Sequence, residues 1–265
     1  MKYAVILGNV GSCSDRYMTG GYSEPFTVEQ LFERLSTIDN VHAVEFVGGW
    51  QLTLDNRQMV KEQLEKFGVP VLVERSSYES GPLARMEWVK LYGVLLGKTD
   101  EAEQVFDDAV RRIAPLENES ATGKTVAFFS ITSNNLATVR KGGDYVAKMI
   151  EMAGGDYVFS DLTDSGNNLA TVNISLEDFY AGAKDADVLI YNSTIEGEIR
   201  TMDELIAKCP LLAQFKAVQQ GSVWCTAQSL FQQSMEMPDL ILDMNKVFTE
   251  GTPDDSELKF LTKIT

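Results

Sequence analysis

The chain has 265 residues, of which 44% are hydrophobic, and its 23 Lys and Arg against 39 Asp and Glu give a net charge of −16. This length is enough for one large domain or two lobes with a sizeable core. The acidic balance argues against a nucleic-acid partner, because phosphate backbones require a basic surface. No apolar run reaches the roughly 18 residues of a membrane helix.

Strand and helix patterns alternate through the first part of the chain. Buried strands are predicted at 3–9, 43–49 and 69–75, and helices at 26–38, 54–68 and 82–97. Segment 99–117 keeps helical spacing of its apolar residues over about three turns. The polar stretch "NESATGK" that follows it is the best candidate for a domain boundary.

The alternation continues through the second half. Strands are predicted at 124–131, 156–161, 187–193 and 222–230, and helices at 144–155, 174–186, 201–210 and 237–248. Thr201 and Glu204 have the spacing of a capping box at the start of one helix. The chain therefore predicts an α/β fold, with parallel sheets flanked by helices and a ligand site beyond the carboxyl ends of the strands.

Cysteine and histidine content limits the chemistry. The three cysteines are Cys13, Cys209 and Cys225, and their number and spacing imply no disulfide framework. The single histidine, His42, excludes a metal cluster built from several His and lies where a buried strand begins. We expect no catalytic residue, no metal site and no cofactor.

Basic, aromatic and amide side chains recur where predicted strands end. Each of them alone is more typical of a surface residue without a role in ligand binding. Their recurrence in an acidic protein, however, favours a cleft for an anionic or polar, partly aromatic ligand. The planar Arg side chain suits carboxylate or catecholate oxygens. The candidate ligand-binding residues are Tyr78, Arg85, Arg140, Lys141, Asn192, Arg200, Trp224 and Gln228.

Residues from about 69 to 265 resemble a known family over nearly the whole of that length. The stretches that carry the resemblance include "GVPVLVERSSYESGPLARMEWVKLYGVLLGK", "TVAFFSITSNN" and "VRKGGDYVAKMIEMAGGDYVF". They are similar to the substrate-binding proteins of ABC importers of the iron-siderophore and cobalamin type, whose two lobes are joined by one long helix. The resemblance implies an N-terminal lobe at 1–98, an inter-lobe helix at 99–117 and a C-terminal lobe at 123–265.

The same resemblance implies a function without catalysis. A metal chelate would bind in the inter-lobe cleft, lined by Tyr78, Arg85, Arg140 and Trp224. The implied compartment is the periplasm or an extracellular lipoprotein, although "MKYAVILGNVGS" is not the pattern of a signal peptide. Docking to an ABC permease would use a Glu in the segment matching "LFQQS", but Gln232 or Gln233 stands there and Glu236 is only near, which weakens that expectation.

Residues 1 to about 67 are similar instead to the opening of sugar-phosphate isomerase/epimerase-like TIM barrels. This second resemblance implies a mosaic joined near Gly68, natural or engineered. It leaves two alternatives to the binding protein: an isomerase/epimerase-type enzyme or its relic, and a chimera without a native ligand.

The hexapeptide "NNLATV" occurs twice, at 134–139 and at 167–172. No longer self-similarity surrounds it, so it does not indicate a repeat fold. The resemblance implies that the first copy is a loop leading to Arg140 in the cleft, whereas the second lies farther from any expected charge. Arg140→Ala is therefore predicted to weaken ligand binding, and Asn173→Ala to do little.

Overall fold

A computed structural model describes residues 3–6, 28–39, 41–45, 57–66, 68, 70–165 and 169–265. The chain divides into two compact units, Met1–Glu74 and Arg75–Thr265. Each unit is described by itself below.

The first unit contains a parallel pair of strands. β1 (Tyr3–Ile6) pairs with β2 (Val41–Glu45), and α1 (Val28–Ser36) lies between them in the chain, as in a βαβ unit. α2 (Arg57–Lys66) follows. Both strands and both helices were predicted, although the predicted ends at 7–9 and 46–49 lie outside the described residues.

The predicted strand at 69–75 is wrong for its described part. Residues 70–75 have no strand partner among the described residues, and Leu72 and Val73 are 52% and 57% exposed. The boundary between the two units falls at Glu74. A short apolar run predicts a strand only if another strand pairs with it, and here the run forms an extended connection instead.

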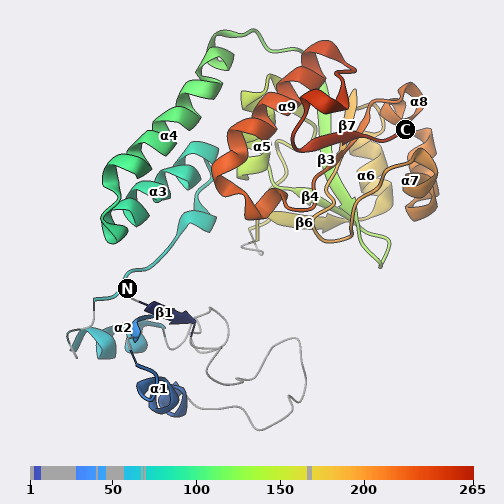
Figure 1. Cartoon of the computed structure of the whole chain (residues 1–265). Coiled ribbons are helices and arrows are strands. Elements are labelled where there is room, and N and C mark those ends of the chain that lie inside the picture. Colours follow the sequence, from blue (N-terminus) through green and yellow to red (C-terminus); the bar gives the residue numbers. More distant parts are fainter. Residues whose placement is uncertain are drawn as a thin grey trace. The chain divides into compact units, whose positions relative to one another are not determined.

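The second unit is built on one mixed sheet (Figure 1). The strands follow the order β6-β4-β3-β7-β8-β9, and β5 also pairs with β3. Their bounds are β3 Lys124–Ile131, β4 Ala137–Arg140, β5 Gly155–Tyr157, β6 Thr171–Ile174, β7 Val188–Tyr191, β8 Val223–Thr226 and β9 Leu261–Lys263. β3, β5, β7 and β8 are parallel, but β4 is antiparallel to both β3 and β6, and β9 to β8. The predicted α/β class is confirmed, with a sheet that is mixed rather than parallel.

Helices cover both faces of this sheet. Figure 1 shows α5 and α9 on one side and α6, α7 and α8 on the other. Along β3, Val126 and Phe128 contribute to the first core, whereas Ala127 and Phe129 contribute to the second, as the two-residue period of a strand requires. The helix bounds are α5 Tyr145–Met152, α6 Leu176–Ala183, α7 Met202–Lys208, α8 Lys216–Gln220 and α9 Met237–Glu250.

Two helices precede the sheet and pack against each other. They are α3 (Pro82–Leu96) and α4 (Thr99–Ile113), and a 3₁₀ turn at Ala114–Asn118 extends α4. The predicted helix at 99–117 is thus present as helix and turn. Its role as a connection between lobes, and the domain limits inferred from it, stay predictions.

The two copies of the hexapeptide form neighbouring strands. β4 comes from the first copy and β6 from the second, and Thr138 pairs with Asn173 in their antiparallel register. The Thr138 hydroxyl donates to Asn173 Oδ1 at 2.7 Å. The expectation that the first copy is a loop is wrong for residues 137–139, which are strand, whereas residues 134–136 form a turn. The two similar sequences thus contribute to adjacent strands, β6 at the edge of the sheet and β4 next to it. Residues 166–168 of the second region lie outside the described part.

Candidate functional site

A cavity of about 280 Å³ lies in the second unit. It is bounded by the end of β4, the first turns of α3 and α5, the 3₁₀ turns before α9 and the start of α9 itself. Its lining combines two arginines with aromatic, apolar and small polar side chains. The lining residues are Ser77, Arg85, Arg140, Tyr145, Met149, Ala170, Leu230, Phe231, Gln233, Ser234, Glu236, Met237, Leu240 and Phe260.

Arg140 is the last residue of β4 and is only 8% exposed. The Tyr157 hydroxyl holds its backbone, because it accepts from the Arg140 N–H at 2.9 Å and donates to the Arg140 carbonyl at 2.8 Å. The guanidinium carbon lies 4.7 Å from the centre of the Phe231 ring and 5.9 Å from that of Tyr145. Backbone and side chain are therefore both fixed, with the guanidinium group held against ring faces.

Arg85 reaches the same cavity from the first turn of α3. Its guanidinium carbon lies 3.9 Å from the centre of the Tyr145 ring. That ring therefore contacts both arginines, while its edge meets Phe231 in a T-shaped pair at 6.4 Å. Burial raises the pKa of the Tyr145 hydroxyl, although both guanidinium groups act in the opposite direction.

Within the described part of the chain, neither guanidinium group donates a hydrogen bond to a protein acceptor. The one ionic partner is Asp144, whose Oδ1 lies 3.5 Å from Arg140 Nη1. Arg85 contacts the Tyr145 ring and forms no ion pair with a described residue. An arginine carries five N–H donors in a planar fork, so most donors of these two groups have no acceptor among the described residues.

The acidic groups near the cavity do not fully neutralise the two arginines, so the cavity wall keeps a net positive charge. Asp144 caps α5 through a hydrogen bond from the Val146 N–H, and its side chain is 4% exposed. Desolvation raises the pKa of Asp144, and Arg140, two backbone N–H groups and Arg85 partly offset that rise. Glu236, which does line the cavity, forms an ion pair with Lys259 at 2.6 Å. One of the two guanidinium charges is thus left without a paired carboxylate.

A tight turn links Arg140 to Asp144. A Cβ added at Gly142 would lie 1.6 Å from the Ser160 carbonyl oxygen, so only glycine fits at this point. The Gly142 N–H also donates to the Leu162 carbonyl. The sequence "RKGGD" can therefore bring the strand-end arginine and the helix cap to the same place.

Several residues predicted for the site lie elsewhere in the unit. Tyr78 is 73% exposed, and Lys141 donates to the Asp164 carbonyl. Trp224 is completely buried in the core, and Gln228 is exposed in the turn after β8. None of these four lines the cavity, and their contact with a ligand stays a prediction.

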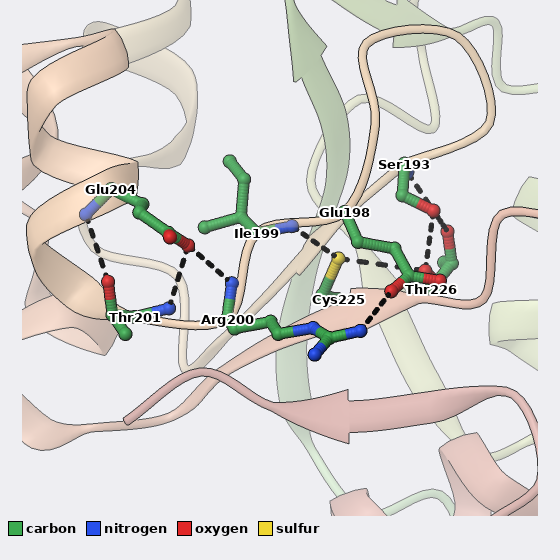
Figure 2. Close-up of polar contacts among 8 residues, drawn as sticks. All are labelled: Ser193, Glu198, Ile199, Arg200, Thr201, Glu204, Cys225 and Thr226. Atoms are coloured by element: carbon green, nitrogen blue, oxygen red, sulfur yellow. Dashed lines mark hydrogen bonds and ion pairs between the residues drawn. The ribbon is translucent and has the colours of Figure 1, made fainter.

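Asn192 and Arg200 belong to the loop that follows β7. The buried Asn192 Oδ1 accepts from the backbone and hydroxyl of Thr194. Figure 2 shows the Arg200 guanidinium pointing to Glu198, with which it forms an ion pair at 3.3 Å, while its backbone N–H donates to Glu204. Glu204 also completes the predicted capping box with Thr201, which is confirmed. Both side chains stabilise this loop and do not line the cavity.

Tyr145 and Phe231 line the cavity beside the two arginines, and the sequence reasoning did not select them. Tyr145 is the first residue of α5, directly after "RKGGD", so its position next to a strand-end arginine was readable. Phe231 lies in the strand-end stretch "VWCTAQSLFQQ", from which only Trp224 and Gln228 were selected, and in the "LFQQS" segment considered for permease docking. No pattern in the chain indicated that this segment turns toward Arg140.

Two searches of the described residues gave no candidate. No group of three or more His, Cys, Asp or Glu there could hold a metal ion. No helix in the same residues is long and apolar enough to cross a membrane.

Comparisons with known proteins agree on one fold. A family model described as "Periplasmic binding protein" matches residues 53–229. An uncharacterized lipoprotein of Methanocaldococcus jannaschii is 29% identical over 183 residues, which are 68% of this chain and 42% of that protein. The chain spans about half the length of the curated relatives it matches.

Two solved structures have the same fold at low identity. A periplasmic heme-binding protein from Roseiflexus sp. RS-1, in apo form, matches with a TM-score of 0.60 and 18% identity over 94% of this chain and 98% of that one. An ABC-type Fe3+-hydroxamate transport system protein from Saccharomonospora viridis matches with a TM-score of 0.54 and 13% identity, over 93% of each chain.

These matches correct the mosaic hypothesis. The family model begins at residue 53, before the supposed joint near Gly68. A structural match over 94% of 265 residues can omit only about 16 of them, so it extends over most of residues 1–67. The resemblance of the N-terminal part to TIM-barrel isomerases is not supported, because short βα units look alike in both folds.

Proposed function

Because the chain belongs to the periplasmic binding protein family, we propose that it is the substrate-binding protein of an ABC importer and that it binds an anionic metal chelate at the cavity of Arg85 and Arg140. The chelate would be an iron-siderophore, a heme or a cobalamin-like compound. Binding, rather than catalysis, would be its activity.

The observation that carries this proposal is the pair of guanidinium groups without hydrogen-bond acceptors. Arg140 is buried and Arg85 is half-buried, and anionic oxygens of a ligand would supply strong, charge-assisted acceptors for donors that otherwise depend on water. Carboxylate, hydroxamate and catecholate oxygens match the planar fork of arginine. The Tyr145 and Phe231 rings add flat apolar surfaces beside the charges.

The names of the solved neighbours support an iron chelate as the ligand class. One is a heme-binding protein and the other belongs to a Fe3+-hydroxamate transport system. A hydroxamate chelate surrounds its iron with oxygen atoms, whereas heme holds its iron through porphyrin nitrogens and carries its anionic oxygens as two peripheral carboxylates. The cavity, at about 280 Å³, is at the small end for a ligand site, and it would hold one anionic edge of such a chelate.

The family and the lipoprotein relative support an extracytoplasmic location, in the periplasm or as a surface lipoprotein. An ABC permease would be the partner. The segment "LFQQS" gives this partner little support, since Phe231, Gln233 and Ser234 line the cavity and Glu236 already pairs with Lys259.

A titration of the purified protein tests the proposal. A ferric hydroxamate, a ferric catecholate, hemin and cobalamin would each be followed through the absorbance of the chelate, because Trp224 is buried in the core and is a poor reporter of the cavity. We expect micromolar or tighter binding of at least one iron chelate. Loss of a charged hydrogen bond costs about 1.5–3 kcal/mol, so Arg85→Ala should weaken it about ten- to a hundred-fold.

Arg200→Ala is the matched control, since it also removes one arginine, but from an exposed position outside the cavity lining. It should leave the affinity unchanged. If no chelate binds at micromolar concentration, or if Arg85→Ala and Arg200→Ala weaken binding equally, the assignment of the site is wrong.

A further inference from the structure

Asp144 pairs with a residue that lines the cavity but does not line it itself. Its carboxylate is almost completely buried and caps α5, and it stands 3.5 Å from Arg140. Its electrostatic influence extends to Arg85 as well, because both guanidinium groups oppose the rise of its pKa. One carboxylate therefore acts on both arginines without itself being in contact with the space that a ligand would occupy.

We propose that Asp144 sets how many negative charges the cavity accepts in a ligand. This inference rests on the proposed function of the cavity. With the Asp144 carboxylate ionised, the two guanidinium groups and this carboxylate sum to one positive charge. The other carboxylate at the cavity, Glu236, is neutralised by Lys259. One anionic group of a ligand then balances the net charge of the cavity wall. A second anionic group adds little further binding affinity.

Asp144 would act on the ligand through its charge and not through direct contact. Asp144 cannot donate a hydrogen bond to an anion while it is ionised, and Arg140 lines the cavity whereas Asp144 does not. Replacing it by Asn removes the charge but keeps an oxygen that can cap α5, because Asn and Asp are equally good N-cap residues. Asp144→Asn should therefore fold normally and raise the net charge of the wall from one to two.

The experiment uses three porphyrins of the same shape. Hemin, its monomethyl ester and its dimethyl ester carry two, one and no carboxylates. Each is titrated into wild-type protein, Asp144→Asn and the control Asp185→Asn, followed by the Soret absorbance. The control removes the same charge from a side chain that is 83% exposed. Circular dichroism and thermal unfolding verify that all variants are folded.

We expect Asp144→Asn to increase the affinity ratio of hemin to its dimethyl ester by on the order of ten-fold, with the monomethyl ester between them. The control should leave this ratio unchanged. An equal loss for all three porphyrins would mean that Asp144 only holds Arg140 in place and would overturn the proposal. No change in the ratio would overturn it as well.

A second measurement covers the case in which wild-type protein binds no porphyrin. That result would count against the proposed iron-porphyrin ligand, but the charge of the cavity is still measurable with small carboxylates. Thermal unfolding is recorded in succinate and in acetate at equal ionic strength. Asp144→Asn should gain more stabilisation from succinate relative to acetate than the wild type does. An identical difference in both proteins would refute the role of Asp144 independently of any chelate.

Discussion

Asp187 links three elements of the second unit, and its ionisation should be visible in stability. Its carboxylate accepts hydrogen bonds from Lys216 Nζ at 2.7 Å and from the backbone and hydroxyl of Thr125 at 3.0 and 2.9 Å. It thereby joins the start of β7 to β3 and to α8. Desolvation raises its pKa, but the hydrogen bonds from Lys216 and Thr125 prevail and lower the pKa from 3.8 to about 2.

The magnitude follows from linkage. A depressed pKa means that the folded state prefers the ionised form, and each pKa unit corresponds to about 1.36 kcal/mol. The shift is therefore equivalent to about 2 kcal/mol at most, because the side chain is 23% exposed and solvent screens part of it. This stability is fully present above the unfolded-state value near 3.8 and is lost as the pH falls through about 2.

Urea unfolding of wild type and Asp187→Asn from pH 7 to pH 3 tests this reasoning. The wild type should be more stable by up to about 2 kcal/mol at pH 7, and the gap should narrow only below about pH 4. Asp185→Asn, a neighbouring exposed change, should show no such gap. A gap that is independent of pH would mean that packing, not ionisation, accounts for the difference, and a gap that widens on acidification would refute the assignment.

Three further substitutions, with Asn173→Ala as a comparison, probe Arg140 and its surroundings at the end of β4. Tyr157→Phe leaves the Arg140 N–H and carbonyl without their partner and should lower the unfolding free energy by about 1–3 kcal/mol; a loss below about 0.5 kcal/mol in urea unfolding would contradict this. Gly142→Ala places a Cβ on the Ser160 carbonyl, so we expect lower stability and weaker chelate binding, and unchanged titrations would show that the turn adapts. Arg140→Ala should weaken chelate binding at least ten-fold, whereas Asn173→Ala should do little; equal effects in the same titration would mean that β6 also contributes to the site.

The sequence predicted those helices and strands that a pattern within the segment itself indicates, such as an apolar run or a capping box. β3 was predicted at its observed bounds, and the capping box of Thr201 and Glu204 marks α7 correctly. β4, β6 and β9 were missed. Each is short and lies antiparallel to a neighbouring strand, outside the alternation of strand and helix from which the parallel strands were predicted. Such pairing depends on tertiary structure, which the periodicity of one segment does not contain.

The charged residues of the site could be predicted from the sequence, but the aromatic residues that line the cavity beside them could not. Arg85 and Arg140 were both selected as basic residues after strands, and the structure brings them to one cavity. Trp224 was selected by the same rule, but its side chain faces the core, because the rule does not determine on which face a strand residue lies. Phe231 depends on how a 3₁₀ turn folds back toward α5, which only long-range packing decides.

A crystal structure of the protein with a bound ferric chelate tests the central claim most directly. We predict anionic oxygens of the chelate within about 3 Å of both the Arg85 and the Arg140 guanidinium groups, with the Tyr145 and Phe231 rings beside the ligand. A chelate bound elsewhere, with both guanidinium groups still lacking acceptors, would contradict the account.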